Sequence, residues 1–102
     1  MELINILKAL SDETRLRILN LLKSHDLCVC ELEILLNINQ SNASRHLNKL
    51  TNAGILEYYK VSKFVYYKIK EDILKNYPFI KEVIQIHVPE LSQFEMDFAL
   101  VM

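Results

Sequence analysis

Two cysteines one residue apart, Cys28 and Cys30, are the residues of this chain whose spacing most directly indicates chemistry. Thiolates are soft donors, so such a pair would hold As(III), Sb(III), Cd(II), Pb(II), Zn(II) or Cu(I) in preference to Mg(II) or Ca(II). A disulfide between them would close a small, strained ring, so we expect reduced thiols. Residues two apart on a regular helix point about 200° apart, so we expect ion capture to distort a helix that contains both.

The rest of the ligand set is open. A third donor to an ion could be His25, Glu31, Glu33, a small-molecule thiol or water. Two other interpretations of the pair stand beside ion capture: two small buried hydrophobic side chains, or a redox or persulfide sensor. An enzyme is not expected, because the chain has no general base spaced for cysteine chemistry, no Cys-x-x-Cys motif and no glycine-rich loop.

Apolar residues at helical spacing predict helices on both sides of the cysteine pair. The first three are expected over about residues 1–10, 11–23 and 31–36. The second of them has an N-cap within Ser11-Asp12-Glu13, where acidic residues favour the helix dipole. The turn 37–39 then leads to a fourth helix, which Asn39 is able to cap.

The fourth helix runs to Gly54, the only glycine of the chain, and has two contrasting faces. Ala43, Leu47 and Leu50 form a narrow apolar stripe. The opposite face carries no acidic residue, although the chain has 13; it presents Ser41, Asn42, Ser44, Arg45, Asn48, Lys49 and Asn52. The alternatives are an ordinary amphipathic surface helix and a winged-helix interaction module without DNA binding or ligand sensing, but the missing acids favour a helix that reads DNA.

A β-hairpin is predicted after this helix, because aromatic and β-branched residues dominate 56–60 and 64–69. Lys60 and Lys63 lie near its tip, where they could touch a phosphate or reach a minor groove. Residues 40–70 hold six basic residues and one acidic residue, whereas the net charge of the whole chain is −1. Phosphate binding needs local positive charge, so this window is the expected DNA interface of a winged helix-turn-helix.

From residue 71 onward the apolar pattern is again helical, with Pro78 suited to a first helical position. Two apolar sets follow, first Phe79, Ile80, Val83, Ile84 and His87, then Leu91, Phe94, Phe98 and Val101. Terminal helices of about 1–10 and 71–102 would carry more apolar surface than a small domain covers alone, so we expect a homodimer, which suits two-fold symmetric DNA.

The 102 residues are expected to form one domain, mainly α with a small β-hairpin. The first residues lack the basic start and apolar run of a signal peptide, and no stretch has the length to span a bilayer. We therefore expect a cytoplasmic protein without membrane contact.

Four ordered motifs over roughly residues 9–70 resemble those of the ArsR family of metal-responsive repressors. Residues 9–19 (ALSDETRLRIL) resemble the opening ALadptRLrIL, and residues 26–32 (DLCVCEL) resemble the metal box ELCVCDL. Residues 39–47 (NQSNASRHL) are similar to the recognition-helix signature SQsxvSRHL, and 64–69 (FVYYKI) to the second wing strand. Together the four are far more specific than any one.

The resemblance implies a dimeric winged-helix repressor that binds a double-stranded operator with an inverted repeat and needs no resident cofactor. It implies release when Cys28 and Cys30 capture a toxic ion, with As(III) first and Sb(III), Cd(II), Zn(II) or a redox signal open. The expected DNA-contacting residues are Gln40, Ser41, Asn42, Ser44, Arg45, His46, Lys49, Lys60 and Lys63. His46 would contact a phosphate or pack against the wing.

Two positions depart from the family pattern. Glu33 stands where arsenic-sensing members often have a third cysteine, which leaves the ligand set open. Ser62 stands where the wing turn usually has glycine, which bears only on the shape of the wing tip.

Overall fold

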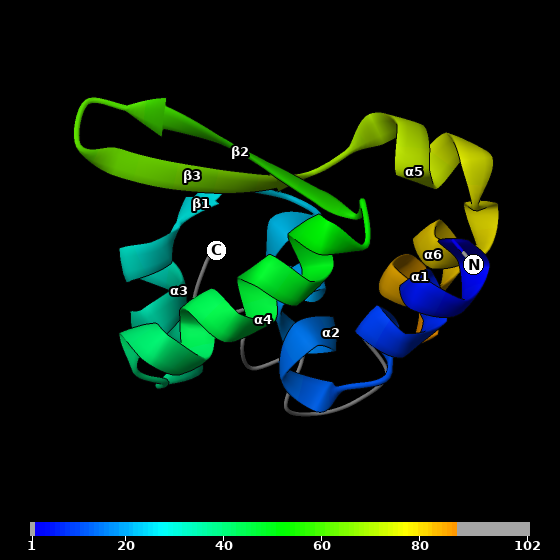
Figure 1. Ribbon diagram of the computed structural model, residues 1–102, viewed down its shortest axis with the longest axis horizontal. Helices are drawn as coiled ribbons and strands as arrows, with labels where there is room; N and C mark the ends of the chain where they lie inside the picture. Colours follow the sequence, from blue (N-terminus) through cyan, green and yellow to red (C-terminus); the bar gives the residue numbers. More distant parts are fainter. Residues whose placement is uncertain (1, 88–102) are drawn as a thin grey trace.

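The computed structural model describes residues 2–87, and these form a winged helix-turn-helix (Figure 1). Its elements in chain order are α1 (Glu2–Leu10), α2 (Glu13–Leu22), β1 (Leu27–Cys28), α3 (Val29–Leu36), α4 (Gln40–Asn52), β2 (Leu56–Val61), β3 (Phe64–Ile69), α5 (Glu71–Asn76), α6 (Pro78–Glu82) and the π-helical turn η1 (Val83–His87). The hairpin β2–β3 lies across one side of the helices, and α1 and α6 lie at the end of the molecule remote from the hairpin tip.

Local side-chain bonds set the ends of the first two helices. The Ser11 hydroxyl donates to the Lys8 carbonyl at 2.9 Å, just past the last turn of α1. Asp12 then caps α2, because its carboxylate accepts from the backbone N–H of Arg15 at 3.0 Å. The N-cap within residues 11–13 is therefore Asp12, whose short carboxylate satisfies one of the helix's unpaired donors.

The turn between α3 and α4 and the end of α4 follow the prediction closely. Asn37 ends α3 in the left-handed conformation (φ 55°), which asparagine tolerates better than most residues. The Asn39 side chain accepts from the N–H of Asn42 at 2.8 Å and caps α4. Gly54 has φ 80° directly after the helix, the conformation that favours glycine at this position.

The sheet has one strand more than the hairpin that the sequence predicts. The strand order is β1-β3-β2, all antiparallel, with Leu27 opposite Tyr67 and Cys28 opposite Tyr66. Strand β1 has only two residues, and Leu27 pairs with Tyr67, 40 residues away in the chain. No local sequence pattern therefore predicts this strand. The wing turn places Ser62 at φ 56°, a region that costs a residue other than glycine some free energy.

The core lies between the sheet and the helices. Ile18, Leu19 and Leu21 of α2 and Leu47 and Leu50 of α4 are fully buried in one cluster, with Tyr67 of β3 at its edge. Each such aliphatic side chain contributes roughly 1.5–3 kcal/mol by leaving water. Val65 and Ile69 of β3 also pack against this cluster, so alternate residues of the strand face the core.

The helices that follow the wing begin as predicted, with Pro78 as the first residue of α6. Ile80 and Ile84 are buried, and His87 is exposed. The second apolar set of this region, from Leu91 to Val101, lies outside the described residues. Within residues 2–87, no helix has the length and apolar character needed to cross a membrane.

Candidate DNA interface and cysteine pair

The polar side of α4 faces solvent as the sequence predicts. Leu47 and Leu50 anchor the opposite side in the core. The side chains exposed along α4 are Gln40, Ser41, Asn42, Arg45, Asn48, Lys49 and Asn52, with Ser44 half-buried. None of these residues is acidic, so the helix offers hydrogen-bond donors and positive charge to a partner and no repulsion toward phosphate.

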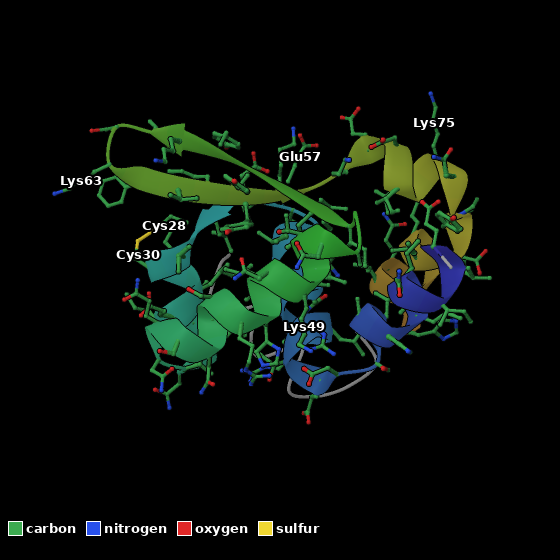
Figure 2. The ribbon with its side chains drawn as sticks, viewed as in Figure 1. Cys28, Cys30, Lys49, Glu57, Lys63 and Lys75 are labelled. Atoms are coloured by element: carbon green, nitrogen blue, oxygen red, sulfur yellow. A yellow bond between two sulfur atoms is a disulfide. The ribbon has the colours of Figure 1, made fainter. Side chains whose placement is uncertain are left out.

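The wing adds a second basic surface. Lys60 and Lys63 are exposed, and Lys63 lies at the free end of the hairpin (Figure 2). The Tyr59 hydroxyl donates to the Asp26 carboxylate at 2.7 Å, and this bond raises the pKa of Tyr59. The bond ties strand β2 to the loop that leads into the cysteine pair. The wing is therefore connected to that loop as well as being placed beside α4.

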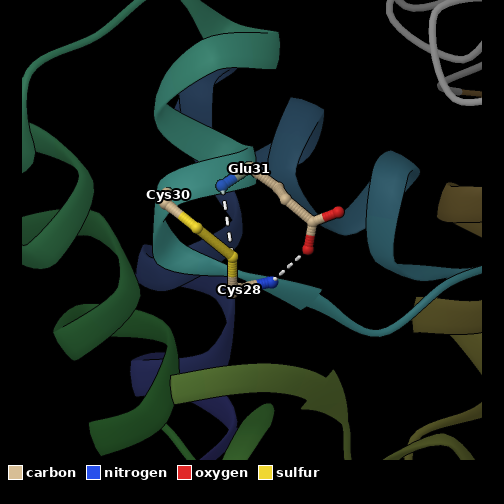
Figure 3. The surroundings of a disulfide bond; sticks show 3 residues. All are labelled: Cys28, Cys30 and Glu31. Atoms are coloured by element: carbon tan, nitrogen blue, oxygen red, sulfur yellow. Dashed lines mark hydrogen bonds between the residues drawn. A yellow bond between two sulfur atoms is a disulfide. The ribbon is translucent and has the colours of Figure 1, made fainter. Parts of the chain in front are cut away.

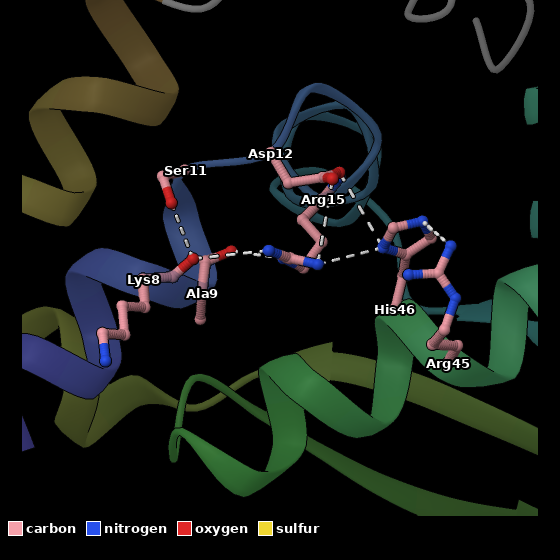
Figure 4. Close-up of polar contacts among 7 residues, drawn as sticks. All are labelled: Lys8, Ala9, Ser11, Asp12, Arg15, Arg45 and His46. Carbon is pink, nitrogen blue, oxygen red and sulfur yellow. Dashed lines mark hydrogen bonds and ion pairs between the residues drawn. The ribbon is translucent and has the colours of Figure 1, made fainter.

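His46 lies elsewhere than either expectation for it. Its side chain is 6% exposed, so it is poorly placed for a DNA phosphate, and its partners belong to α2 and α4 and not to the wing. Nδ1 lies 3.2 Å from Nη1 of Arg15, and Nε2 lies 3.3 Å from Nη2 of Arg45 (Figure 4). His46 thus lies between Arg15 and Arg45, and its contact with DNA stays a prediction.

Arg15 is a structural residue that the sequence analysis missed. It is 8% exposed, and its Nε donates to the Ala9 carbonyl at 2.6 Å while Nη2 donates to the Lys8 carbonyl at 3.3 Å. Asp12 lies 3.9 Å from Arg15 and 3.8 Å from His46. We call Asp12, Arg15 and His46 the arginine–histidine cluster; it joins the end of α1, the start of α2 and the middle of α4.

A signal for this cluster exists in the sequence. Arg15, Ile18, Leu19 and Leu22 follow the i, i+3, i+4, i+7 spacing of one helix face, and the last three are core residues. A charged residue on an apolar face must find partners when it is buried. The spacing therefore marks Arg15 as buried and paired, although it does not name His46 as the partner.

The electrostatics of the cluster hold His46 neutral near pH 7. Burial lowers the pKa of His46, and the charges of Arg45 and Arg15 lower it as well, against the opposing attraction of Asp12. For Asp12, burial raises the pKa, but the N–H of Arg15 and its guanidinium charge outweigh burial and leave the pKa below its ordinary value. A neutral imidazole can accept from the always-charged Arg15 at Nδ1.

The cysteine pair differs from the expectation in two respects. Cys28 and Cys30 are joined by a disulfide, where reduced thiols were expected (Figure 3). Their sulfurs also meet without any distortion of α3, because Cys28 is extended (φ −81°, ψ 163°) and precedes the helix, which begins at Val29 and not at Glu31. The angular separation on a helix therefore does not apply, and the two Cα atoms lie 5.4 Å apart.

Cys28 acts as the N-cap of α3. Its Sγ accepts from the backbone N–H of Glu31 at 3.4 Å, and the Glu31 carboxylate accepts from the N–H of Cys28 at 2.9 Å. This reciprocal capping box usually has serine or threonine in place of the cysteine. A helix N-terminus favours a thiolate over a thiol, so the position also suits a reactive sulfur once the disulfide is reduced.

The two cysteines differ in solvent exposure, and within the described part of the chain they do not belong to a cluster of metal-binding side chains. Cys28 is 4% exposed, whereas Cys30 is exposed and reaches a pocket of about 260 Å³ between α3, the start of α4 and the wing tip. Across residues 2–87, no group of three or more His, Cys, Asp or Glu side chains could hold a metal ion. Glu31, one of the predicted third donors, is engaged in the cap. Glu33, another of the predicted third donors, lines the same pocket as both cysteines. A thiophilic ion on the two soft sulfurs would therefore take any further ligand from Glu33 or from solution.

The cysteine pair adjoins the wing and lies at the start of the helix that packs against α4. Cys28 pairs with Tyr66 of β3, the inner strand of the wing. Residues Val29–Leu36 form the helix that packs against α4. Cys28 and Cys30 therefore adjoin both the wing and the helix that packs against α4.

Comparison with known proteins agrees with this architecture. The family described as "Bacterial regulatory protein, arsR family" matches residues 12–58. An arsenic resistance transcriptional regulator, ArsR2 of Pseudomonas putida, is 37% identical over 97 residues, covering 94% of this chain and 82% of its own length. A cadmium resistance transcriptional regulatory protein, a CadC homolog of Staphylococcus aureus, is 38% identical over 77 residues, which cover 74% of this chain and 64% of the length of that regulator.

A solved structure shows the same fold. The homodimeric winged helix-turn-helix DNA-binding domain of a possible ArsR-family regulator from Mycobacterium bovis superposes with a TM-score of 0.72 at 26% identity, over 89% of this chain and 85% of that one. The fold and the basic face of α4 are those of a DNA-binding transcriptional regulator of the winged helix-turn-helix class. Within that class, the chain belongs to the ArsR family.

Proposed function

We propose that this regulator is a repressor that binds operator DNA as a homodimer and leaves it when one reagent bonds to both Cys28 and Cys30. One observation carries the proposal: the two sulfurs converge at the start of α3, at the junction of the wing and the recognition helix. A group bonded there changes the N-cap of α3 and the β1–β3 pairing together. If it binds the DNA-free arrangement better, it shifts the protein away from DNA by that difference in affinity.

Arsenite is the first candidate for the reagent. Trivalent arsenic forms three bonds, so two protein sulfurs leave one bond for hydroxide. Arsenous acid, As(OH)₃, and the two thiols form two As–S bonds and release two waters, without a change of oxidation state. A Zn(II) site needs about four ligands, and residues 2–87 gather no such group. The relative named as an arsenic resistance regulator covers nearly the whole chain.

A redox signal at the same residues is the second candidate, and the disulfide favours it. A hydroperoxide would accept two electrons and two protons from the dithiol, giving the disulfide, water and an alcohol. A persulfide donor, R–SSH, would instead transfer its outer sulfur to the exposed Cys30 thiol, which becomes a persulfide while R–SH leaves. In either case, the same cap and the same strand pairing respond.

On the DNA side, Arg45 is the residue proposed to read a base, because it is exposed in the middle of α4 and long enough to reach guanine. Gln40, Ser41, Asn42, Ser44 and Lys49 would contact the groove and its phosphates, and Lys60 and Lys63 would contact phosphates from the wing. The proposed dimer surface includes α1, where Leu3, Ile4 and Leu7 are exposed. Two copies of α4 related by a two-fold axis suit an inverted repeat.

The test is fluorescence anisotropy of operator DNA with the reduced full chain and with the double variant Cys28→Ser/Cys30→Ser. Serine keeps the cap at position 28, so the variant should bind DNA like the wild type. Arsenite, Cd(II), Zn(II), a hydroperoxide and a persulfide donor are titrated separately. Release of the wild type alone by arsenite supports the first candidate, and release by an oxidant alone supports the second. If none releases the wild type, the cysteines are not the sensing site.

A further inference from the structure

His46 in the middle of α4 has an arginine against each nitrogen of its ring. Nδ1 lies 3.2 Å from Nη1 of Arg15, and Nε2 lies 3.3 Å from Nη2 of Arg45 (Figure 4). A guanidinium group has N–H donors and no acceptor, whereas a neutral imidazole has one N–H and one free lone pair. His46 can therefore accept a hydrogen bond from only one of the two arginines.

The exposure of the two arginines decides which of them bonds to the lone pair. Arg15 is 8% exposed, so an N–H that loses its acceptor there keeps its cost of desolvation. Asp12 cannot replace the imidazole, because its Oδ2 lies 3.9 Å from Nη1 of Arg15, beyond the length of a hydrogen bond. Arg45 is exposed and can donate to water instead. The lone pair is therefore best placed on Nδ1, toward Arg15, with the proton on Nε2, toward Arg45.

The opposite tautomer leaves more buried donors without an acceptor. With the proton on Nδ1, this N–H and Nη1 of Arg15 would point at each other. The Asp12 carboxylate attracts a proton on Nδ1, but at 3.8 Å from that nitrogen it is too far away to form a hydrogen bond with it. With the proton on Nε2, only that N–H faces another donor, and this donor belongs to the exposed Arg45. The charge of Lys49 acts on the protonation of the ring as a whole.

We propose that His46 is a positioning residue for Arg45: its proton stays on Nε2, so the ring offers Arg45 no acceptor and the guanidinium remains available to DNA. This inference rests on the proposed function of Arg45 as the residue that reads a base. An acceptor at the place of Nε2 would hold Arg45 against α4, and DNA would first have to break that bond. A guanidinium that faces a ring N–H turns instead to acceptors such as O6 and N7 of guanine.

Arg15 keeps the choice of tautomer constant. Its Nε and Nη2 donate to the carbonyls of Ala9 and Lys8, which fixes the guanidinium with Nη1 against the His46 ring. A buried residue 31 positions away thereby determines which group Arg45 meets on its own helix. The arginine–histidine cluster contributes to DNA recognition in this way, without touching DNA itself.

The first measurement locates the proton on the ring. Two-bond ¹H–¹⁵N correlations from the carbon-bound ring protons distinguish a protonated ring nitrogen from an unprotonated one. They are recorded on the full chain at about pH 8, where the imidazole is neutral because its pKa is lowered from the ordinary value. The signals of His46 are identified by their loss in His46→Asn. We expect the proton on Nε2; a proton on Nδ1, or one shared equally between the two nitrogens, overturns the inference.

Two variants differ in whether they place an acceptor beside Arg45. In His46→Gln the side-chain carbonyl reaches the place of Nε2, and its oxygen should hold the guanidinium. In His46→Asn the shorter side chain keeps an acceptor for Arg15 and does not reach Arg45. The readout is the ratio of affinities, by fluorescence anisotropy, for a duplex that the wild type selects from a random-sequence pool and for a random duplex of equal length. The ratio should fall by about three- to tenfold in His46→Gln and by less than about twofold in His46→Asn.

The same comparison in an Arg45→Ala background shows whether the effect passes through Arg45. There, His46→Gln should change the ratio no further. The inference is overturned if His46→Gln leaves the ratio unchanged, if both His46 variants lower it alike, or if the loss persists without Arg45; the proposed function survives each of these results. If Arg45→Ala itself leaves the ratio unchanged, the base-reading role fails and the positioning role fails with it. Circular dichroism checks that the variants fold, and if they do not, the position of the proton in the wild type decides.

Discussion

The recognition helix α4 is braced by two polar clusters that differ in almost every physical respect. Toward the wing, Cys28, Cys30 and Glu31 begin α3, the helix that packs against α4. Toward α1 and α2, the arginine–histidine cluster of Asp12, Arg15 and His46 holds α4 through His46. One brace has an exposed sulfur, whereas the other has its arginine and histidine at 8% and 6% exposure.

This contrast shows how a small domain can be both firm and responsive. Ionic hydrogen bonds that are buried resist change, because each partner left alone keeps its desolvation cost. Sulfur at the edge of a helix can be bonded, bridged or oxidised by solutes without entering the core. We interpret the arginine–histidine cluster as the fixed reference for α4 and the cysteine pair as the adjustable one.

The largest expected effect comes from breaking the fixed brace. Arg15→Met removes the bonds to the Ala9 and Lys8 carbonyls and to His46, so the buried Ala9 carbonyl and His46 Nδ1 lose this donor, whereas the Lys8 carbonyl keeps the one from Ser11. We expect the free energy of unfolding to fall by about 3 kcal/mol. Urea unfolding at one fixed protein concentration measures it, since the stability of a dimer depends on concentration. The exposed change Lys8→Ala serves as the control, and equal losses in the two variants would show that Arg15 is not a brace.

The next predictions concern the two surfaces proposed to contact DNA, the exposed side of α4 and the wing. Arg45→Ala should weaken operator binding by about 1–3 kcal/mol and weaken binding to random DNA less, because a base contact is lost. Lys63→Ala on the wing should weaken both kinds of DNA alike and reduce the slope of log K against log salt by about 1. Anisotropy over a range of salt concentrations separates the two. A uniform loss for Arg45→Ala would place it on a phosphate instead.

The same contrast explains what could be predicted from the sequence. The limits of α4 were predictable because Asn39 and Gly54 act locally, through one side-chain bond and one backbone angle. The exposed polar side of α4 was predictable because helical spacing assigns each residue to a face. The cysteine pair was found because its residue types are rare and its spacing is short.

What escaped prediction depends on contacts between distant residues or on unusual chemistry. Strand β1 exists only through its pairing with β3, and His46 faces inward because Arg15, 31 residues away, offers it a partner. The start of α3 was misplaced by two residues because cysteine is not among the common N-cap residues. That same error produced the expectation that the sulfurs could not meet on an intact helix.

A smaller effect measures how much the Cys28 cap of α3 contributes to the free energy of unfolding. In reducing buffer, Cys28→Val removes the acceptor for the N–H of Glu31 while keeping an apolar side chain of similar size at a buried position. We expect a loss of about 1 kcal/mol, typical of a lost N-cap. Cys28→Ser keeps an acceptor and should lose little or gain. Thermal and urea unfolding of the two variants decide the point, and identical stabilities would mean that the sulfur contributes nothing as a cap.

The smallest expected effect concerns pH and isolates His46 within the fixed brace. Because the folded state lowers the pKa of His46 below its ordinary value of 6.5, the unfolded chain binds the proton more readily. The stability from neutral His46 is therefore complete above about pH 6.5 and is lost as the pH falls from there through the lowered pKa. The Asp12 contribution disappears only below the ordinary pKa of 3.8 for this group, at more acidic pH.

Urea unfolding between pH 7.5 and 5 should show the decline in the wild type and a flatter profile in His46→Gln, with the exposed His25→Gln matching the wild type. A decline that His46→Gln fails to flatten would assign the pH dependence to another group and leave the cluster a purely geometric brace.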